Sequence, residues 1–135
     1  MTLPNLLAKC QKVFNEYIRL RDSDDRGFFK CISCGQIKAI SDMDAGHYYN
    51  VGHFGGLRFD EDNCHGQCSQ CNRFLGGNLI EYTKNLPVKI GAEAFYRLEV
   101  RAGVYKRTSM KWSRFDIEYK IKEYKQKIKE IPKHY

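Results

Sequence analysis

The residues best suited to chemistry gather in one stretch of the chain, from Asp44 to Asn72. This stretch holds three of the four histidines, three of the six cysteines and four acidic residues. An imidazole with a pKa of about 6.5 accepts a proton from water at neutral pH, and carboxylate and amide oxygens bind hard divalent cations. Hydrolysis of a phosphodiester bond uses both kinds of group, and His47 is our candidate for the base. A purely structural strand histidine is the alternative.

Two Cys-x-x-Cys pairs predict a structural zinc site. Cys31 and Cys34 form the first pair, and Cys68 and Cys71 form the second after 33 intervening residues. A two-residue spacer lets both thiolates of a pair point at one ion, and four thiolates close a tetrahedral shell with no open position. We therefore expect a structural zinc on these four cysteines, with Cys64 as the competitor of Cys68. Redox or disulfide pairs are the alternative.

A second, catalytic ion is expected near His47, and Mg²⁺ or Mn²⁺ would suit its oxygen ligands. Asn72 offers an amide oxygen directly after the second cysteine pair, and Asp44 is the nearest acid before His47. Residues three apart in a regular strand point to opposite faces, so Asp44 needs a bulge at Gly46 to reach the same side as His47. A turn or capping role is the alternative for Asp44. The substitute ligands are Asp42 and His65.

Other polar residues of the stretch have expected roles. Asn63 would orient the loop or hydrogen-bond the His47 imidazole, with a plain helix cap as the alternative. His65 is near enough in sequence for a metal or phosphate. Arg58 would clamp a phosphate bidentately, and its alternative is a salt bridge with Asp60, Glu61 or Asp62. Possible contacts to the sugar-phosphate chain are Arg73, Tyr48 and Tyr49, although strand tyrosines are more often half-buried packing.

The elements that must position these residues begin with a helix and a zinc knuckle. Apolar residues at three- and four-residue steps predict a helix over residues 3–21, with Cys10 as a small buried hydrophobe on its apolar stripe. Residues 28–40 place short apolar pieces on both sides of the first cysteine pair. This pattern predicts two short strands joined by the knuckle turn.

A strand, a loop, a second strand and a helix are expected to follow. Residues 42–49 have the apolar and aromatic content of a strand, and residues 57–59 are its expected hairpin partner. The glycine-rich loop 50–56 joins them. Residues 68–75 are expected to form a short helix, closed by the two glycines that follow.

The C-terminal part is expected to be helical. Residues 78–85 and 92–101 suggest two helices separated by Pro87 and Gly91, and residues 103–110 interrupt the pattern. A last helix should start at Ser113 and run toward Pro132. Its apolar stripe either packs on the first helix, which we favour, or pairs with a second copy in a homodimer. The stripe comprises Ile117, Ile121, Tyr124, Ile128 and Ile131.

Charge is distributed unevenly along the chain, which at 135 residues is expected to be one domain. Residues 1–80 contain nine basic and nine acidic residues, whereas residues 81–135 contain fourteen and seven. This basic excess suits a polyanion such as DNA, with Lys120 and Lys125 on a DNA-facing helix surface, although a solvated surface is the alternative. The sequence shows neither a signal peptide nor a membrane span, so we expect a cytoplasmic protein with no membrane partner.

The order of these motifs resembles the HNH or ββα-metal (His-Me finger) nucleases, with His47, Asn63 and Asn72 in their characteristic places. The Cys-x-x-Cys-Asn ending is similar to phage endonuclease VII. A narrower resemblance is to the phage NinG (Rap) recombination endonuclease family. It is carried by FNEYIRLRD, CISCG, DAGHY, LRFDEDN, QCSQCN and GNL, in that order.

The resemblance implies an α+β fold. A zinc-stabilised ββα-metal core over residues 28–80 would be flanked by an N-terminal helix in residues 1–27 and by the basic helical part, residues 81–135. It also implies a metal-dependent endonuclease of phage or prophage origin that cleaves branched recombination intermediates such as Holliday junctions and D-loops. A nickase or restriction-type nuclease on ordinary duplex DNA and a non-catalytic zinc module are the alternatives. The sequence departs from the commonest pattern at Gly46, where an aspartate usually precedes the base.

Overall fold

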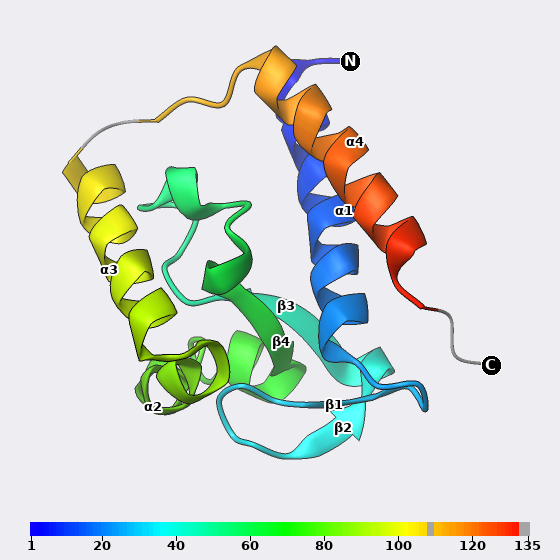
Figure 1. The fold of residues 1–135 in the computed structure, drawn as a ribbon, viewed down its shortest axis with the longest axis vertical. Coiled ribbons are helices and arrows are strands. Elements are labelled where there is room, and N and C mark those ends of the chain that lie inside the picture. Colours follow the sequence, from blue (N-terminus) through cyan, green and yellow to red (C-terminus); the bar gives the residue numbers. More distant parts are fainter. Residues whose placement is uncertain (108–109, 133–135) are drawn as a thin grey trace.

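A computed structural model describes residues 1–107 and 110–132, and shows a mixed α+β architecture (Figure 1). Helices α1 and α4 lie side by side along one edge, α3 lies on the opposite edge, and the β3–β4 hairpin runs between them. The helices are α1 (Leu3–Asp22), α2 (Leu79–Ile90), α3 (Ala92–Arg107) and α4 (Arg114–Glu130). The strands are β1 (Phe28–Lys30), β2 (Ile37–Ala39), β3 (Met43–His47) and β4 (Cys64–Cys68).

Helix α1 confirms the predicted first helix. The Thr2 hydroxyl accepts a hydrogen bond from the Asn5 backbone N–H at 3.3 Å and caps the helix start. Its apolar stripe, which includes Phe14, is buried against α4 and the hairpin. Cys10 is fully buried, and burial raises its thiol pKa to about 11, as expected for a small core residue.

Helix α4 confirms the predicted last helix and the packing we favoured for it. The Ser113 hydroxyl accepts from the Asp116 backbone N–H at 3.1 Å, which forms the expected cap. Ile117, Ile121 and Tyr124 are buried against α1. The apolar stripe of α4 is therefore used inside the chain.

The hairpin differs from the prediction in its second strand. Strand β3 pairs antiparallel with β4, whereas Leu57 ends a 3₁₀ turn and Arg58 has helical backbone angles. Leu57 and Phe59 are buried, so their apolar character reflects core packing without a strand. Strand β4 was missed because its sequence, CHGQC, is polar although all five residues are buried.

Glycines and a left-handed asparagine turn the chain after β4. A five-residue π-helical turn, Gln70–Phe74, stands where a longer helix was predicted over residues 68–75. Gly76, Gly77 and Asn78 all have positive φ angles, and they lead directly into α2.

The two middle helices are longer than predicted. Helix α2 continues past Pro87 to Ile90 because Tyr82 and Leu86 bury its inner face against α3. Helix α3 continues to Arg107, beyond the predicted end at residue 101. No helix among the described residues has the length and apolar character needed to cross a bilayer.

Candidate metal centre and active site

The four predicted cysteines come together as one site. Their Sγ atoms lie within 4.8 Å of one another, and the Cys34 and Cys68 Sγ atoms are 3.9 Å apart. Zinc bound at about 2.3 Å from each of four sulfurs in a tetrahedron would separate the sulfurs by about 3.8 Å. The donor set therefore fits a structural zinc. Cys64 lies at the other end of β4 in the α1–α4 core, which excludes it from the site.

Several N–H groups point at the cysteine sulfurs. The Cys68 backbone N–H donates to Cys31 Sγ at 3.3 Å, and the Cys71 backbone N–H donates to Cys68 Sγ at 3.4 Å. The Asn78 side-chain amide donates to Cys71 Sγ at 3.4 Å. Such donors stabilise thiolates, so the local backbone is arranged for a metal-bound state.

Asp44 and Asn72 lie together beside this site. Asn72 Nδ2 donates to Asp44 Oδ2 at 3.0 Å, although the two residues are 28 positions apart. Arg73 binds the same carboxylate bidentately, with Nε and Nη2 each 2.9 Å from an oxygen. The Asp44 side chain is 16% exposed and the Arg73 side chain 64%. The substitute ligand Asp42 instead pairs with Lys38.

His47 ends β3 and faces α1. Its ring stacks on Phe14 with centroids 6.4 Å apart, and its Nε2–H donates to the Arg58 carbonyl oxygen at 3.0 Å. Burial lowers the pKa of the imidazole, and the nearby Arg58 charge lowers it further. The ring is therefore neutral at pH 7, with Nδ1 left as the proton acceptor.

The predicted bulge at Gly46 is absent, because β3 and β4 pair without interruption from Met43 to His47. Asp44 and His47 consequently point to opposite faces of the strand. Ala45 and His47 face α1, whereas Asp44 faces Asn72. Gly46 serves another purpose, since a Cβ there would overlap the Gln67 side chain.

Asn63 holds the loop that follows β3, as one of its predicted roles required. Its Oδ1 accepts from the Tyr49 backbone N–H at 2.8 Å, and its Nδ2 donates to the carbonyls of Tyr49 and Leu57 at 3.0 and 3.3 Å. The side chain is fully buried. The oxygen is thus used by the backbone and not by His47, and the nearby cap is supplied by Asp60.

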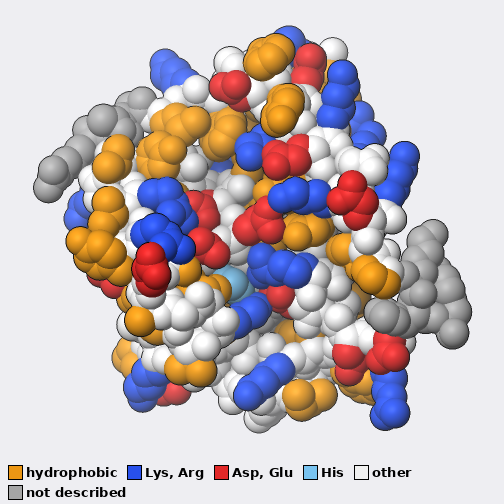
Figure 2. Space-filling view, in the orientation of Figure 1, with side chains coloured by type: hydrophobic (Ala, Val, Ile, Leu, Met, Phe, Trp, Pro, Cys, Tyr) orange, Lys and Arg blue, Asp and Glu red, His pale blue; other side chains and the backbone are white. Residues whose placement is uncertain are grey.

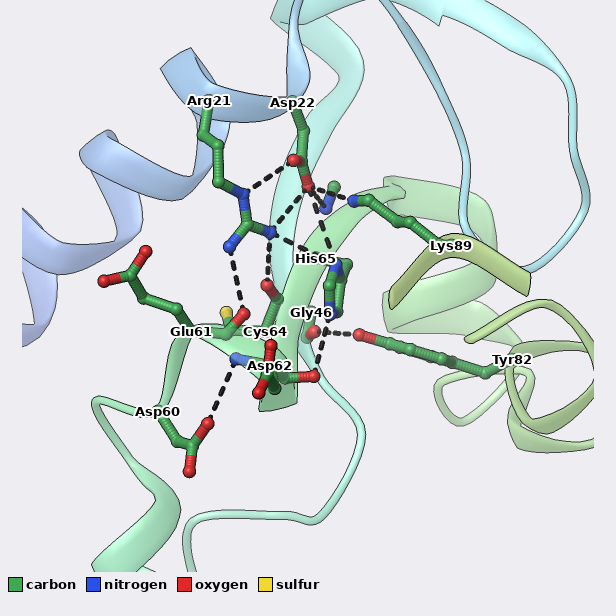
Figure 3. A network of polar contacts seen from close by, with 11 residues as sticks. Arg21, Asp22, Gly46, Asp60, Glu61, Asp62, Cys64, His65, Tyr82 and Lys89 are labelled. Atoms are coloured by element: carbon green, nitrogen blue, oxygen red, sulfur yellow. Dashed lines mark hydrogen bonds and ion pairs between the residues drawn. The ribbon is translucent and has the colours of Figure 1, made fainter. Parts of the chain in front are cut away.

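His65 is buried in a polar network that leaves neither ring nitrogen free (Figure 3). Its Nε2–H donates to the Asp62 carbonyl at 2.8 Å, and its Nδ1 accepts from Arg21 at 3.1 Å. Burial, together with the charges of Lys89 and Arg21, lowers its pKa to about 3. His65 is therefore a structural group, and its ring nitrogens are not available for the predicted contact with a metal or a phosphate.

The same network contains residues that the sequence did not single out. Arg21 and Asp22 end α1 and reach onto β4, where the Asp22 carboxylate accepts from the Gly66 N–H and from Lys89, both at 2.8 Å (Figure 3). Arg21 also donates to the Glu61 and Cys64 carbonyls. Charged residues at a helix end resemble ordinary surface residues in sequence, and no role was predicted for Arg21 and Asp22 although they end the FNEYIRLRD motif.

Arg58 is half-buried and does not form the salt bridge that was its alternative role. Its guanidinium donates to Gln11 Oε1 at 3.2 Å. Among the residues that the structure describes, no carboxylate pairs with it, because the three neighbouring acids have other cationic partners. Asp60 and Asp62 pair with Arg101, and Glu61 pairs with Lys127.

The remaining predicted contact residues divide between packing and surface. Tyr48 and Tyr49 are half-buried and pack on each other and on neighbouring rings, which agrees with the packing alternative. Lys120 pairs with Glu123 at 3.1 Å, whereas Lys125 is exposed. Figure 2 shows Lys and Arg side chains interspersed with Asp and Glu over one face.

The fold and this site define a small α+β protein built around a four-cysteine centre suited to zinc. The chain belongs to the NinG family, described as Bacteriophage Lambda NinG protein, which matches residues 3–134. It is similar to the protein ninG of Escherichia phage lambda, with 34% identity over 93% of this chain and 56% of the relative. No solved structure gives a significant match.

Two further relatives support the same assignment. The protein ninG of Salmonella phage P22 is 36% identical over 93% of this chain and 57% of its own length. That of Enterobacteria phage H19B is 40% identical over 69% of this chain and 44% of its own length. The chain spans about half the length of the curated relatives it matches.

Proposed function

We propose that this chain is a metal-dependent DNA endonuclease of the HNH type, with His47 as the base. The observation that carries the proposal is the state of this imidazole at the end of β3. The Arg58 carbonyl holds the Nε2–H tautomer and burial lowers the pKa, so Nδ1, which no described residue hydrogen-bonds, can accept a proton at neutral pH. A structural histidine usually has both nitrogens engaged, as His65 does.

Arg58 supplies the positive charge that a phosphate needs beside this base. Its guanidinium is held by Gln11 alone among the described residues, so its charge is available to an incoming anion. A guanidinium binds phosphate oxygens bidentately. His47 would therefore take a proton from water at Nδ1 while Arg58 orients the phosphodiester.

The divalent ion of this proposal is assigned to Asp44 and Asn72. Bound there, an ion such as Mg²⁺ or Mn²⁺ would supply positive charge for a phosphate on the face of β3 opposite His47. The carboxylate and the amide already touch, and the exposed Arg73 that occupies the carboxylate forms a weak surface pair. His47 lies on the other face of β3, so the ion assignment stands apart from the base assignment and has its own test.

Branched DNA is the proposed substrate, and this part rests on the family resemblance. The test compares a four-way junction with a linear duplex of the same sequence, with and without added Mg²⁺. Selective cleavage of the junction supports the proposal, and equal cleavage of both supports the duplex nuclease instead.

The mutational test of the base is His47→Ala, with His53→Ala as the matched control. His53 lies in the exposed loop and binds only Asn50 among the described residues. We expect His47→Ala to reduce cleavage at least about 100-fold while zinc content and DNA binding remain. Cleavage at the wild-type rate would overturn the role of His47.

The ion is tested by Asp44→Ala, measured as cleavage against Mg²⁺ concentration. A shift of the metal dependence to higher concentration supports the Asp44–Asn72 assignment. An unchanged dependence combined with normal cleavage would place the ion elsewhere and leave the nuclease proposal intact.

A second function, a non-catalytic zinc module that binds nucleic acid, is favoured by one observation. His47 and Asp44 point to opposite faces of an uninterrupted strand, which separates the base from the predicted ion ligands. In that case the chain would bind DNA at unchanged affinity with or without Mg²⁺ and would cleave neither substrate.

A further inference from the structure

Trp112 ties the C-terminal part of the chain to the turn before Arg58. It lies in the segment between α3 and α4, two helices on opposite edges of the molecule (Figure 1). Its indole Nε1–H donates to the Gly55 carbonyl oxygen at 2.9 Å. The Arg58 backbone N–H donates to the same oxygen at 3.3 Å, which closes the 3₁₀ turn Gly55–Leu57. One carbonyl therefore joins Trp112 to the backbone of Arg58.

The Trp112 ring holds the other side of Arg58 by packing. It meets the Phe59 ring edge to face, with centroids 4.9 Å apart. The Phe59 ring meets Phe14 in the same way at 5.7 Å, and Phe14 stacks on His47. Because Phe59 directly follows Arg58, the peptide group that carries the Arg58 carbonyl lies between two contacts of one indole.

This carbonyl is the group that accepts the His47 Nε2–H bond, at 3.0 Å. An acceptor at Nε2 fixes the tautomer of the imidazole and the direction in which Nδ1 points. The Arg58 carbonyl belongs to neither a helix nor a strand, so contacts on both sides of it set its position. A displacement of about 1 Å in such a positioning contact can reduce a catalytic rate about 100-fold.

Helix α3 adds a second contact to the same turn. The Tyr105 ring lies directly against Gly56, where a Cβ would overlap the ring. Gly56 is therefore required for the close approach of helix and turn. Two aromatic residues from the C-terminal part, Tyr105 and Trp112, thus hold the turn that leads to the Arg58 carbonyl.

We infer that Trp112 is a positioning residue for His47, which acts through the turn before Arg58. The indole N–H fixes the turn, the turn fixes the carbonyl, and the carbonyl fixes the Nε2–H side of the imidazole. Trp112 does not touch the reacting atoms. The consequence for cleavage rests on the proposed nuclease function, whereas the consequence for the His47 N–H does not.

The first test measures exchange of the His47 Nε2–H proton with water, by NMR of protein that carries isotope-labelled histidine. Trp112→Phe removes the N–H donor and keeps a ring to pack on Phe59. We expect exchange to become at least about fivefold faster, as for the loss of one ordinary hydrogen bond.

Ser113→Ala is the matched control for this test. It removes one hydrogen bond from the start of α4, one residue away from Trp112, and leaves the Gly55 carbonyl bonded. We expect it to change the His47 exchange rate less than about twofold. Unchanged exchange in Trp112→Phe, or equal acceleration in both variants, would overturn the inference. Thermal melting and zinc content check that both variants fold.

A second test needs no substitution. Trp112 is the sole tryptophan of the chain, so its indole N–H gives a single signal. If the indole holds the turn, the indole N–H, the Arg58 amide and the His47 Nε2–H should exchange with the same opening free energy. An indole N–H that exchanges freely while the His47 proton is protected would overturn the inference, as would a His47 proton that exchanges as fast as in free imidazole.

Cleavage kinetics test the consequence for the base. Trp112→Phe should lower kcat about tenfold and leave KM within about twofold, because it displaces the base without removing a substrate contact. Ser113→Ala should leave kcat within about twofold. Equal losses of kcat in the two variants would overturn the positioning role. Absence of cleavage by the wild type would instead reject the proposed function, and the exchange measurements would still decide the role of Trp112.

Discussion

The two ends of the β3–β4 hairpin are held in place by different means. At the end nearest Met43 and Cys68, four cysteine sulfurs gather around one point in an arrangement that fits a zinc ion. At the end nearest His47 and Cys64, side chains such as Asn63 bind backbone groups directly. The comparison shows that one short hairpin has a cysteine cluster suited to zinc at one end and hydrogen-bonded side chains at the other.

The largest expected effect comes from breaking the cysteine end. Cys68→Ser should abolish tight zinc binding and unfold the knuckle region, because metal binding supplies the folding free energy of such sites. Cys64→Ser is the control at the opposite end, and it should lose some stability while keeping one zinc per chain. Zinc content and thermal melting measure both. Full zinc content in Cys68→Ser would contradict the four-cysteine site.

Breaking the hydrogen-bonded end should cost less. Asn63→Ala leaves the N–H and carbonyl of Tyr49 and the Leu57 carbonyl without their partner, so we expect a loss of about 3 kcal/mol in the free energy of unfolding. Faster hydrogen exchange at the Tyr49 amide should accompany it. Asn50→Ala, in the exposed loop, is the control and should change stability by less than about 1 kcal/mol. Equal losses of stability in Asn63→Ala and Asn50→Ala would show that Asn63 has no special role in holding the loop after β3.

Acid should weaken the fold through the two histidines of the hairpin. The pKa of His65 is lowered to about 3 and that of His47 is lowered as well, so both take up a proton less readily in the folded protein than in the unfolded chain. The unfolded chain binds protons below about pH 6.5, so stability falls as pH decreases, for His65 down to about pH 3 and by up to about 1.4 kcal/mol per pH unit, and His47 contributes a loss of the same sign. Urea unfolding at several pH values measures the slope.

Histidine substitutions test the origin of this pH dependence, with His53 as the control. His65→Gln should flatten the slope, whereas His53→Gln, in the exposed loop, should leave it unchanged. A slope that survives both His65→Gln and His47→Gln would assign the acid sensitivity to carboxylates such as Asp22, whose pKa the Arg21 and Lys89 contacts hold below its usual range.

The smallest effect is expected at the surface pair beside the cysteines. Arg73→Ala should change the free energy of unfolding by less than about 1 kcal/mol, because the guanidinium binds Asp44 bidentately but is largely exposed. It should at the same time raise Mn²⁺ affinity at Asp44 by freeing the carboxylate, as measured by electron paramagnetic resonance. Unchanged Mn²⁺ binding, with Asp44→Ala also unchanged, would argue against an ion at this place.

Periodic and spaced patterns in the sequence predicted most of the scaffold. The apolar steps of α1 and α4 and the Cys-x-x-Cys spacing each reflect one dominant force, burial or metal ligation, so they remain visible in sequence. Asp44 and Asn72 were expected together as ligands of one ion, and they do lie in contact, but in a regular strand without the bulge that the prediction required.

Features that depend on specific hydrogen bonds were not visible. Strand β4 buries His65 and Gln67, and Arg21, Ser33 and the Gly77 carbonyl, from distant segments, bind His65 Nδ1 and Gln67 Nε2. Polar residues in sequence indicate exposure on average, so a strand satisfied in this way resembles a loop. The side to which Asp44 faces depended likewise on a strand register that only the fold defines.

The packing of α1 against α4 also has a consequence for how the chain is made. The two helices share one core, yet about 90 residues separate the end of α1 from the start of α4. At a synthesis rate of roughly 5–20 residues per second, the apolar stripe of α1 would remain unpaired for several seconds before α4 is synthesised. That interval is long compared with collapse of the chain, so the nascent protein is exposed to aggregation until α4 leaves the ribosome.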